Sequence, residues 1–353
     1  MISLRQNPDL PERAISILSV GAGGIVENAH YPAYRLAGFP VAGVFDAVRE
    51  RAERAAQIVG APVVDSLAEL VRRAPAEVIY DVAVPGAVVE DVLAELPEGA
   101  FVLIQKPLGE TYAQAQRIVA QCEAKGLRAA VNFQLRWAPY MLALQDAVAQ
   151  GLLGEVYELE FKINVLTPWA NWKFLESAPR MEMVYHSIHY LDFIRHLWGE
   201  PTGVMALSLN DPSSPRLEST RSTISLNYDR TRRATVQTFH NHQAPPGHAE
   251  SYCRLDGTRG SMWVQMGLNL NYPEGGPDRI EIWRQGDAAW TEIPCEGGWF
   301  PHAFIGPMAA MMRWHAGGPA PWTEVHDSLR TMRLVETAYR CSDEGGRNPN
   351  LER

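Results

Sequence analysis

The sequence predicts two domains: an α/β domain with a doubly wound parallel sheet, then an α+β domain with a large, open, mostly antiparallel sheet. Up to residue 133, continuous apolar runs alternate with helical patterns, as strands buried by helices on both faces require. After it, short strand-like runs are separated by turn residues, which is typical of antiparallel sheets. We therefore expect domains at 1–133 and 134–353, and 353 residues are enough for two.

In the first half, strands and helices are expected to alternate without interruption. One helix should break at His30-Tyr31-Pro32 and end near Gly38, because proline lacks an N–H and clashes with the preceding turn. Ser66 is typical of a helix N-cap. The expected strands are 15–20, 41–46, 63–64, 77–84, 101–105 and 128–133, and the expected helices are 49–59, 67–73, 86–96 and 110–125.

The second half should contain one long sheet and few helices. The expected strands are 156–166, 203–209, 222–228, 234–240, 251–256, 261–265 and 279–284, and the expected helices are 139–150, 183–197, 303–315 and 325–341. An open sheet with an uncovered face usually packs against a partner subunit. We therefore expect a homodimer or homotetramer that associates through this sheet.

A glycine turn after the first strand predicts dinucleotide binding. The apolar run Ile15–Val20 ends at Gly21-Ala22-Gly23-Gly24, a helical pattern follows, and the next strand ends in Asp46. Gly21 would make the tight turn and Gly23 would let the backbone approach a pyrophosphate at the helix N-terminus. Asp46 would accept hydrogen bonds from the ribose hydroxyls and so favour NAD over NADP, although Arg49 and Arg51 lie close in sequence. Val26 occupies the third position of G-x-G-x-x-G.

Composition excludes several classes of partner. The net charge of −9 argues against nucleic acid. No apolar run approaches the length of a membrane span, and the first residues lack the apolar core of a signal peptide. The four cysteines are widely spaced and form no C-x-x-C, as expected of idle thiols in a reducing compartment. We expect a cytoplasmic protein with no membrane partner.

Two segments carry candidate catalytic side chains. Lys106 follows the strand at 101–105, and ligands bind beyond the carboxyl ends of such strands, although a surface lysine is the commonest alternative. On the later helix, Tyr185 and His189 are four residues apart, and Asp192 could orient the His189 imidazole. His186 and His189 form H-x-x-H, and His240 and His242 alternate on a strand. No cysteine or acidic pair completes a familiar ligand spacing, so no metal is expected.

Polar and aromatic residues between these segments are candidates for substrate binding. Asn132 and Arg136 lead out of the first domain, and Trp169, Trp172 and Lys173 precede the histidine helix. Aromatic planes with amide and cationic groups suit a polyhydroxylated ligand. Arg136 or Lys173 could instead bind a carboxylate, and the tryptophans could belong to the core.

Taken together, these motifs resemble the Gfo/Idh/MocA oxidoreductase family, and the resemblance covers essentially the whole chain. The matching features are the glycine turn, the acidic strand end at Asp46, Gln105-Lys106-Pro107, Asn132 with Arg136, and the helix segment Tyr185–Asp192. The resemblance implies an NAD(P)-dependent redox step on a sugar, inositol or sugar acid, with Lys106 and His189 as the catalytic pair. The implied cofactor-binding residues are Gly21, Gly23, Gly24, Ile25, Asp46, Gln105, Lys106 and Asn132. The implied substrate-binding residues are Lys106, Arg136, Trp169, Trp172, Lys173, Tyr185, His186 and His189.

Two positions depart from the family pattern. Where the family has a glutamate before the lysine, this chain has Gln105. Where the family has an aspartate four residues before the histidine, this chain has Tyr185. We expect Tyr185 to take over that aspartate's place, by binding substrate or by sharing proton transfer with Lys106. Two alternatives stay open: a transient redox step that enables isomerisation, elimination or glycosidic cleavage, and a non-catalytic NAD-binding regulator. The presence of both Lys106 and His189 counts against the regulator.

Overall fold

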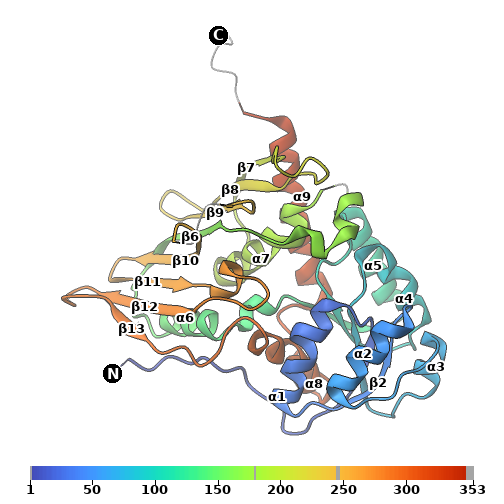
Figure 1. Cartoon of the computed structure of the whole chain (residues 1–353). Helices are drawn as coiled ribbons and strands as arrows, with labels where there is room; N and C mark the ends of the chain where they lie inside the picture. Colours follow the sequence, from blue (N-terminus) through green and yellow to red (C-terminus); the bar gives the residue numbers. More distant parts are fainter. Residues whose placement is uncertain (1, 179, 244–246, 347–353) are drawn as a thin grey trace. The chain divides into compact units, whose positions relative to one another are not determined.

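The computed structural model describes residues 2–178, 180–243 and 247–346, and the chain divides into two compact units (Figure 1). The five-stranded unit contains Arg5–Leu142 and Glu296–Met332. The eight-stranded unit contains Ala143–Cys295, the first few residues and the segment from Arg333. Because Glu296–Met332 packs with the N-terminal sheet, the units are not divided by the single boundary expected after residue 133. As a division between cofactor binding and substrate binding, that boundary stays a prediction.

The five-stranded unit has the parallel sheet that the apolar runs predict. Its strands are β1 (Ser16–Val20), β2 (Val41–Phe45), β3 (Val78–Val82), β4 (Phe101–Gln105) and β5 (Arg128–Asn132), in the order β2-β1-β3-β4-β5. All neighbouring strands are parallel. The strand order reverses direction at β1 and β3, so the carboxyl ends there form the switch point at which such sheets bind ligands.

This unit has as many helices as the sequence predicts, but several of them begin or end at other residues than predicted. They are α1 (Tyr31–Ala37), α2 (Arg49–Val59), α3 (Leu67–Arg72), α4 (Val89–Glu95), α5 (Tyr112–Ala124) and α8 (Ile305–His315), with short turns η2 (Gly86–Val88), η3 (Gln134–Trp137) and η8 (His302–Phe304). The Ser66 hydroxyl accepts from the Glu69 N–H, which confirms the predicted cap. Thr111 caps α5 in the same way, so that helix begins at Tyr112 rather than at residue 110.

Two local expectations were wrong. The strand expected at 63–64 is a single bridge between Val63 and Val44. The helix expected to break at Pro32 is continuous, because the π-helical turn η1 (Val26–His30) leads directly into α1. Pro32 lies in the first turn of α1, where a missing N–H matters less than in the interior of a regular helix.

The eight-stranded unit is built on one mixed sheet. Its strands are β6 (Val156–Asn164), β7 (Gly203–Leu209), β8 (Arg221–Asn227), β9 (Arg233–Phe239), β10 (Glu250–Gly257), β11 (Gly260–Gln265), β12 (Arg279–Arg284) and β13 (Thr291–Ile293). The order is β13-β12-β11-β10-β6-β9-β8-β7, and β6 with β9 is the parallel pair. The fold class expected from the sequence is therefore confirmed, while the short strand β13 was not predicted.

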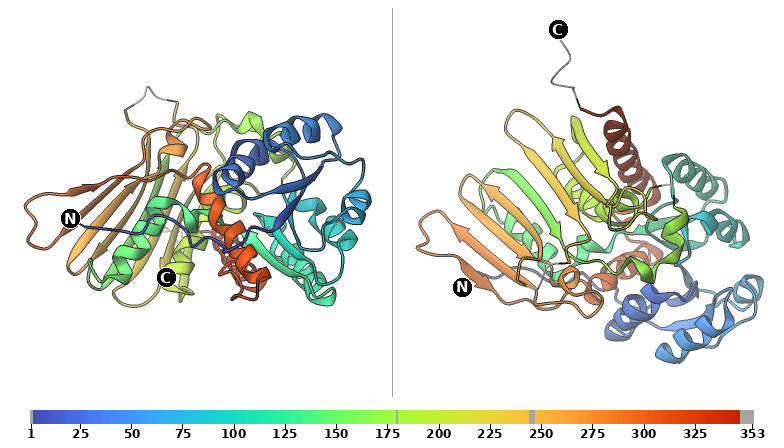
Figure 2. Two further views of the ribbon diagram at one scale, coloured as in Figure 1. Left: turned by 90° about the horizontal axis from the view of Figure 1, so that it is seen from below. Right: turned by 45° about the horizontal axis from the view of Figure 1, so that its top comes forward.

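Helices cover one face of this sheet and leave the other open (Figure 2). They are α7 (Ile188–Trp198) and the parts of α6 (Pro139–Ala149) and α9 (Val325–Glu344) that belong to this unit, which begin at Ala143 and at Arg333. The short turns of this unit are η4 (Trp169–Asn171), η5 (Lys173–Ser177), η6 (Met183–Ser187) and η7 (Gly267–Leu270). Phe161 of β6 stacks on Tyr190 of α7, with ring centroids 4.8 Å apart. On the open face, the edge strand β7 exposes Met205 and Leu207 by 64% and 48%. In the described part of the chain, no helix has the length and apolar character needed to cross a membrane.

Candidate functional site

The glycine turn is shaped by the backbone after β1. Gly21 has a φ of +96°, and a side-chain carbon there would overlap the carbonyl oxygen of Ala83. Both observations require glycine, as predicted. A side-chain carbon added at Gly23 would meet no protein atom within 4 Å. Because the helix begins at Gly24, N–H groups that a helix leaves unpaired at its start adjoin this open space, as an anion site requires.

Asp46 is hydrogen-bonded to the backbone of the same turn. Its Oδ2 accepts from the Ala22 N–H at 2.7 Å, and its Oδ1 accepts from the Val48 N–H at 2.8 Å. A carboxylate oxygen can accept more than one hydrogen bond, so both oxygens retain capacity for a ribose hydroxyl. The guanidinium of Arg49 is paired with Glu53 at 2.8 Å and with Asp65. Two carboxylates therefore already compensate the arginine charge beside this site.

Two buried amide side chains mark the carboxyl ends of β4 and β5. Gln105 and Asn132 lie opposite each other in the parallel register. Gln105 Oε1 and Asn132 Oδ1 are buried and have no hydrogen-bond partner among the described residues. An unsatisfied buried acceptor costs about 1–3 kcal/mol. Two such acceptors at the ligand-binding end of the sheet fit a group that brings N–H or O–H donors, as a dinucleotide does.

Lys106 follows Gln105 directly and is partly buried. Burial lowers the pKa of its ammonium group to about 8. A lysine whose pKa lies this close to neutrality is suited to proton chemistry.

A polar network beneath the glycine turn was missed by the sequence analysis. His30 Nδ1 lies 2.8 Å from Asp81 Oδ2, and the Tyr34 hydroxyl donates to the same oxygen at 2.8 Å. Asn132 Nδ2 lies 3.5 Å from His30 Nε2, so the network reaches the end of β5. All four side chains are at most 1% exposed. The network links η1, α1, β3 and β5, and it therefore supports the turn and the strand end together.

Arg136 has partners inside the five-stranded unit. It is 2% exposed, and its guanidinium contacts Asp327 Oδ2 at 2.8 Å and the Trp322 carbonyl oxygen at 3.0 Å. These contacts favour an anchoring role, because the charge is compensated by a carboxylate of the protein. The substrate contact expected for Arg136 stays a prediction.

The aromatic residues expected to bind substrate gather in the eight-stranded unit. Trp169, Trp172 and Tyr185 pack against a small core of Leu175, Met181 and Leu217. The rings of Trp169 and Trp172 are 6.1 Å apart, and Tyr185 contacts Phe174 at 5.6 Å. Lys173, between them in the sequence, is exposed. Partly buried aromatic rings beside an exposed cation match the surface that a polyhydroxylated ligand requires.

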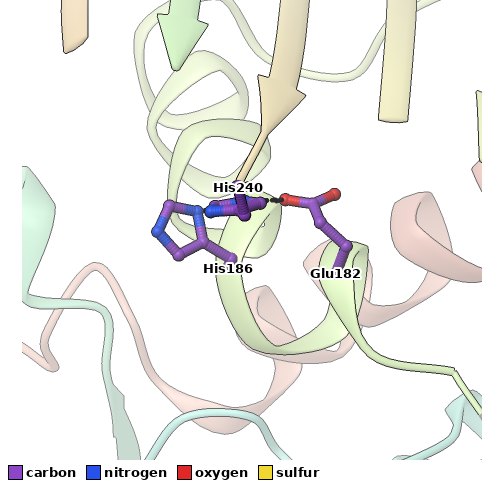
Figure 3. A group of neighbouring side chains, drawn as sticks. All are labelled: Glu182, His186 and His240. Atoms are coloured by element: carbon purple, nitrogen blue, oxygen red, sulfur yellow. Dashed lines mark hydrogen bonds and ion pairs between the residues drawn. The ribbon is translucent and has the colours of Figure 1, made fainter. Parts of the chain in front are cut away.

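The histidines of this unit fall into different environments. His189 is 5% exposed and lies in the first turn of α7. His186 lies in the π-helical turn η6, and its ring centroid is 4.2 Å from that of His240. Glu182 completes a cluster with these two rings, as Figure 3 shows. Glu182 was missed by the sequence analysis, although its spacing of four residues from His186 places both on one helix face.

Two family models match the chain. Residues 15–133 match the "Oxidoreductase family, NAD-binding Rossmann fold" model, and residues 141–263 match the "GFO/IDH/MocA C-terminal domain" model. The D-apiose dehydrogenase of Paraburkholderia graminis is 26% identical over 336 residues, which cover 92% of this chain and 87% of that protein.

Solved structures show the same fold at low identity. An oxidoreductase from Agrobacterium radiobacter, in complex with NAD⁺, L-tartaric acid and magnesium, is 20% identical, covers 95% of this chain and 98% of its own, and has a TM-score of 0.73. A 3-ketoreductase from Actinomadura kijaniata, in complex with NADP and TDP-benzene, is 18% identical, covers 93% and 98%, and has a TM-score of 0.74. The two matched models together span most of the chain, in the order that the fold requires, and the protein therefore belongs to the GFO/IDH/MocA oxidoreductase family.

Proposed function

We propose that this protein oxidises a secondary hydroxyl group of a sugar, inositol or sugar acid, with NAD as the hydride acceptor. The observation that carries the proposal is the end of β4 and β5, where two buried amide oxygens that have no hydrogen-bond partner in the described part of the chain adjoin Lys106. A sugar-type substrate is supported by the similarity to a D-apiose dehydrogenase over nearly the whole chain. The aromatic cluster of Trp169 and Trp172 supplies flat apolar faces for the sugar ring.

In the proposed reaction, the hydride and the hydroxyl proton of the substrate go to different groups. When bound, the nicotinamide supplies the two-electron acceptor for the hydride of the carbinol C–H. His189 takes the hydroxyl proton, and the ammonium group of Lys106 stabilises the negative charge that develops on oxygen. Tyr185 binds the substrate or shares the proton transfer. The products are a ketone, the reduced cofactor and one proton.

A preference for NAD is supported by the surroundings of Asp46. A carboxylate at the end of β2 accepts from the ribose 2′-hydroxyl and repels a 2′-phosphate. Of the two arginines close to Asp46 in sequence, Arg49 and Arg51, the first is paired with Glu53 and Asp65. The expected cofactor-binding residues Gly21, Gly23, Gly24 and Ile25 form the glycine turn and the start of the helix. In this proposal, their backbone N–H groups bind the pyrophosphate of the cofactor.

The open sheet supports self-association. Met205, Leu207 and Leu209 of β7 are exposed and lie on one face, because alternate residues of a strand point the same way. We propose that a second copy of this chain covers them. Light scattering should give a dimer or tetramer for the wild type and a smaller species for Leu207→Glu. A wild type that is monomeric at micromolar concentration would contradict this proposal.

Deuterium transfer tests the proposed reaction. With a substrate deuterated at the carbinol carbon, mass spectrometry should find the label in reduced nicotinamide, in a one-to-one ratio with ketone. The departures at Gln105 and Tyr185 favour a second candidate, a transient redox step. In that case the label returns to an altered product and no reduced cofactor accumulates. Cofactor binding without any transfer of label would favour the non-catalytic regulator.

A further inference from the structure

Glu182, His186 and His240 form a cluster of potential metal ligands inside the eight-stranded unit (Figure 3). Glu182 immediately precedes η6, His186 lies within it, and His240 directly follows β9. The Glu182 and His240 side chains are fully buried, whereas His186 is 17% exposed. A carboxylate that is buried this completely requires compensation by positive charge or by hydrogen bonds.

The spacing of the three side chains suits a metal ion. One ligand atom from each residue lies within 4.8 Å of the other two. Glu182 Oε1 is 3.2 Å from His240 Nε2 and 3.9 Å from His186 Nδ1. A tetrahedral Zn²⁺ ion with bonds of ordinary length holds its ligand atoms about 3.4 Å apart. The two separations from Glu182 Oε1 bracket this value, and the ligand atoms of the cluster all lie within 4.8 Å of one another.

The surrounding hydroxyl groups orient the ligands as they do in established metal sites. Thr167 Oγ1 lies 2.8 Å from His240 Nδ1. If the imidazole donates from Nδ1 to this hydroxyl, the lone pair of Nε2 is directed at Glu182 and is available to a metal. Ser187 Oγ donates to both carboxylate oxygens of Glu182, at 2.8 and 2.9 Å, and Ser222 Oγ also donates to Oε2. These contacts fix the carboxylate without neutralising it.

The π-helical turn explains why the cluster exists. Ser187 follows Glu182 by five residues and nevertheless contacts its carboxylate. In a π turn, hydrogen bonds span five residues instead of four, which brings such pairs together. The same turn keeps His186 within 3.9 Å of Glu182. π turns are frequent at functional sites, and this one brings Glu182 and His186 together, while His240 joins them from the end of β9.

We propose that Glu182, His186 and His240 bind one first-row divalent metal ion, for which Zn²⁺ has the best-matched chemistry. Two imidazoles and one carboxylate are the ligand set of zinc sites that keep a fourth position open. That position takes a water molecule or an oxygen of a ligand. Metal binding here does not depend on the proposed dehydrogenase function.

Metal binding can be measured directly on the untagged, full-length protein. After removal of metal with a chelator, calorimetric titration with Zn²⁺ should give one site per chain. Bound Co²⁺ should show the visible absorption of a tetrahedral N/O site. His186→Gln should weaken Zn²⁺ binding by more than about 100-fold, because losing a ligand costs more than losing an outer-shell partner. His248→Gln, which removes an exposed histidine of the same unit, should leave Zn²⁺ binding unchanged.

Two results would overturn the proposal. One is the absence of a stoichiometric Zn²⁺ or Co²⁺ site in folded wild-type protein, which would leave Glu182 and His240 as a buried hydrogen-bonded pair. The other is equal affinity in the wild type and His186→Gln. Glu182→Gln provides a second test, but its side chain is fully buried. His186→Gln is therefore the deciding variant, with its fold checked by circular dichroism.

Discussion

Lys106 should destabilise the cofactor-free protein at neutral pH. Burial lowers its pKa from 10.5 to about 8. A shift of one unit corresponds to 1.36 kcal/mol, so holding the ammonium group in the folded protein costs about 3 kcal/mol at pH 7. Lys106→Met keeps an unbranched side chain and removes the charge. We therefore expect Lys106→Met to be more stable than the wild type by up to about 3 kcal/mol.

The pH dependence gives this prediction a definite sign. Between about pH 8 and pH 10.5, the unfolded chain retains the lysine proton and the folded protein has lost it. Stability rises with pH wherever the unfolded state binds more protons. The wild type should therefore gain stability across this window, and its difference from Lys106→Met should shrink. Below about pH 8 both states are protonated, so the difference should be constant.

Urea unfolding followed by tryptophan fluorescence measures the difference, in cofactor-free protein between neutral and alkaline pH. Lys125→Met is the matched control in the same unit, because that ammonium group donates to the Ala94 carbonyl at the surface. The control should change stability by less than about 0.5 kcal/mol. A Lys106→Met protein no more stable than the wild type at pH 7, or a difference that is unchanged up to pH 10.5, would refute the reasoning.

Four further predictions follow from the same geometry. The value of kcat/KM for oxidation should fall above about pH 8 as the Lys106 ammonium group loses its proton, and a pH–rate profile that stays level to about pH 10 would exclude that charge from the mechanism. Asp46→Ala should weaken NADH binding by about 10-fold or more in a fluorescence titration, because a charge-assisted hydrogen bond is lost; tighter binding of NADPH than NADH by the wild type would contradict the NAD preference. Asp81→Asn should lower the free energy of unfolding by about 2–4 kcal/mol in urea, because it disrupts the buried hydrogen bonds that Asp81 makes with His30 and Tyr34; a change below about 0.5 kcal/mol would show that the network contributes little. Tyr185→Phe should reduce turnover by at least about tenfold, as expected for loss of a group that assists proton transfer, whereas wild-type turnover would remove the phenol from the mechanism.

The arrangement of strands could be predicted because it is encoded locally. The five apolar runs of the parallel sheet are continuous, and seven of the eight strands of the larger sheet alternate clearly enough to be found. The strand β13 has only three residues, which is too short for a periodic pattern. The strand predicted at 63–64 was wrong for the same reason, because a single bridge at Val63 is too short to leave a periodic pattern.

The π turns could not be predicted from helical periodicity. The sequence pattern of a regular helix, with 3.6 residues per turn, offers two alternatives: the helix continues through Pro32 or ends there. Neither alternative describes the π-helical turn η1. The same limit applies to η6, where the contact between Glu182 and Ser187 depends on a spacing of five residues. The glycine turn and Asp46, by contrast, were predictable, because a positive φ and a strand-end carboxylate leave direct traces in the sequence.

The burial of polar side chains was the least predictable property. Arg136 resembled a substrate-binding cation in the sequence, and its partner Asp327 lies 191 residues further along the chain. The network of His30, Asp81 and Asn132 joins segments up to 102 residues apart. No local pattern reports such partners, because they are defined only when the sheet has assembled.

The most direct test of the account is the absorbance of reduced nicotinamide, recorded with the purified protein, NAD⁺ and a panel of sugars, inositols and sugar acids. NADP⁺ and Lys106→Ala serve as controls, and NADH fluorescence verifies that the variant still binds cofactor. The account predicts a substrate-dependent increase with NAD⁺ that is lost in Lys106→Ala. An equal increase in the variant, or no increase and no altered product from a wild type that binds NADH, would contradict it.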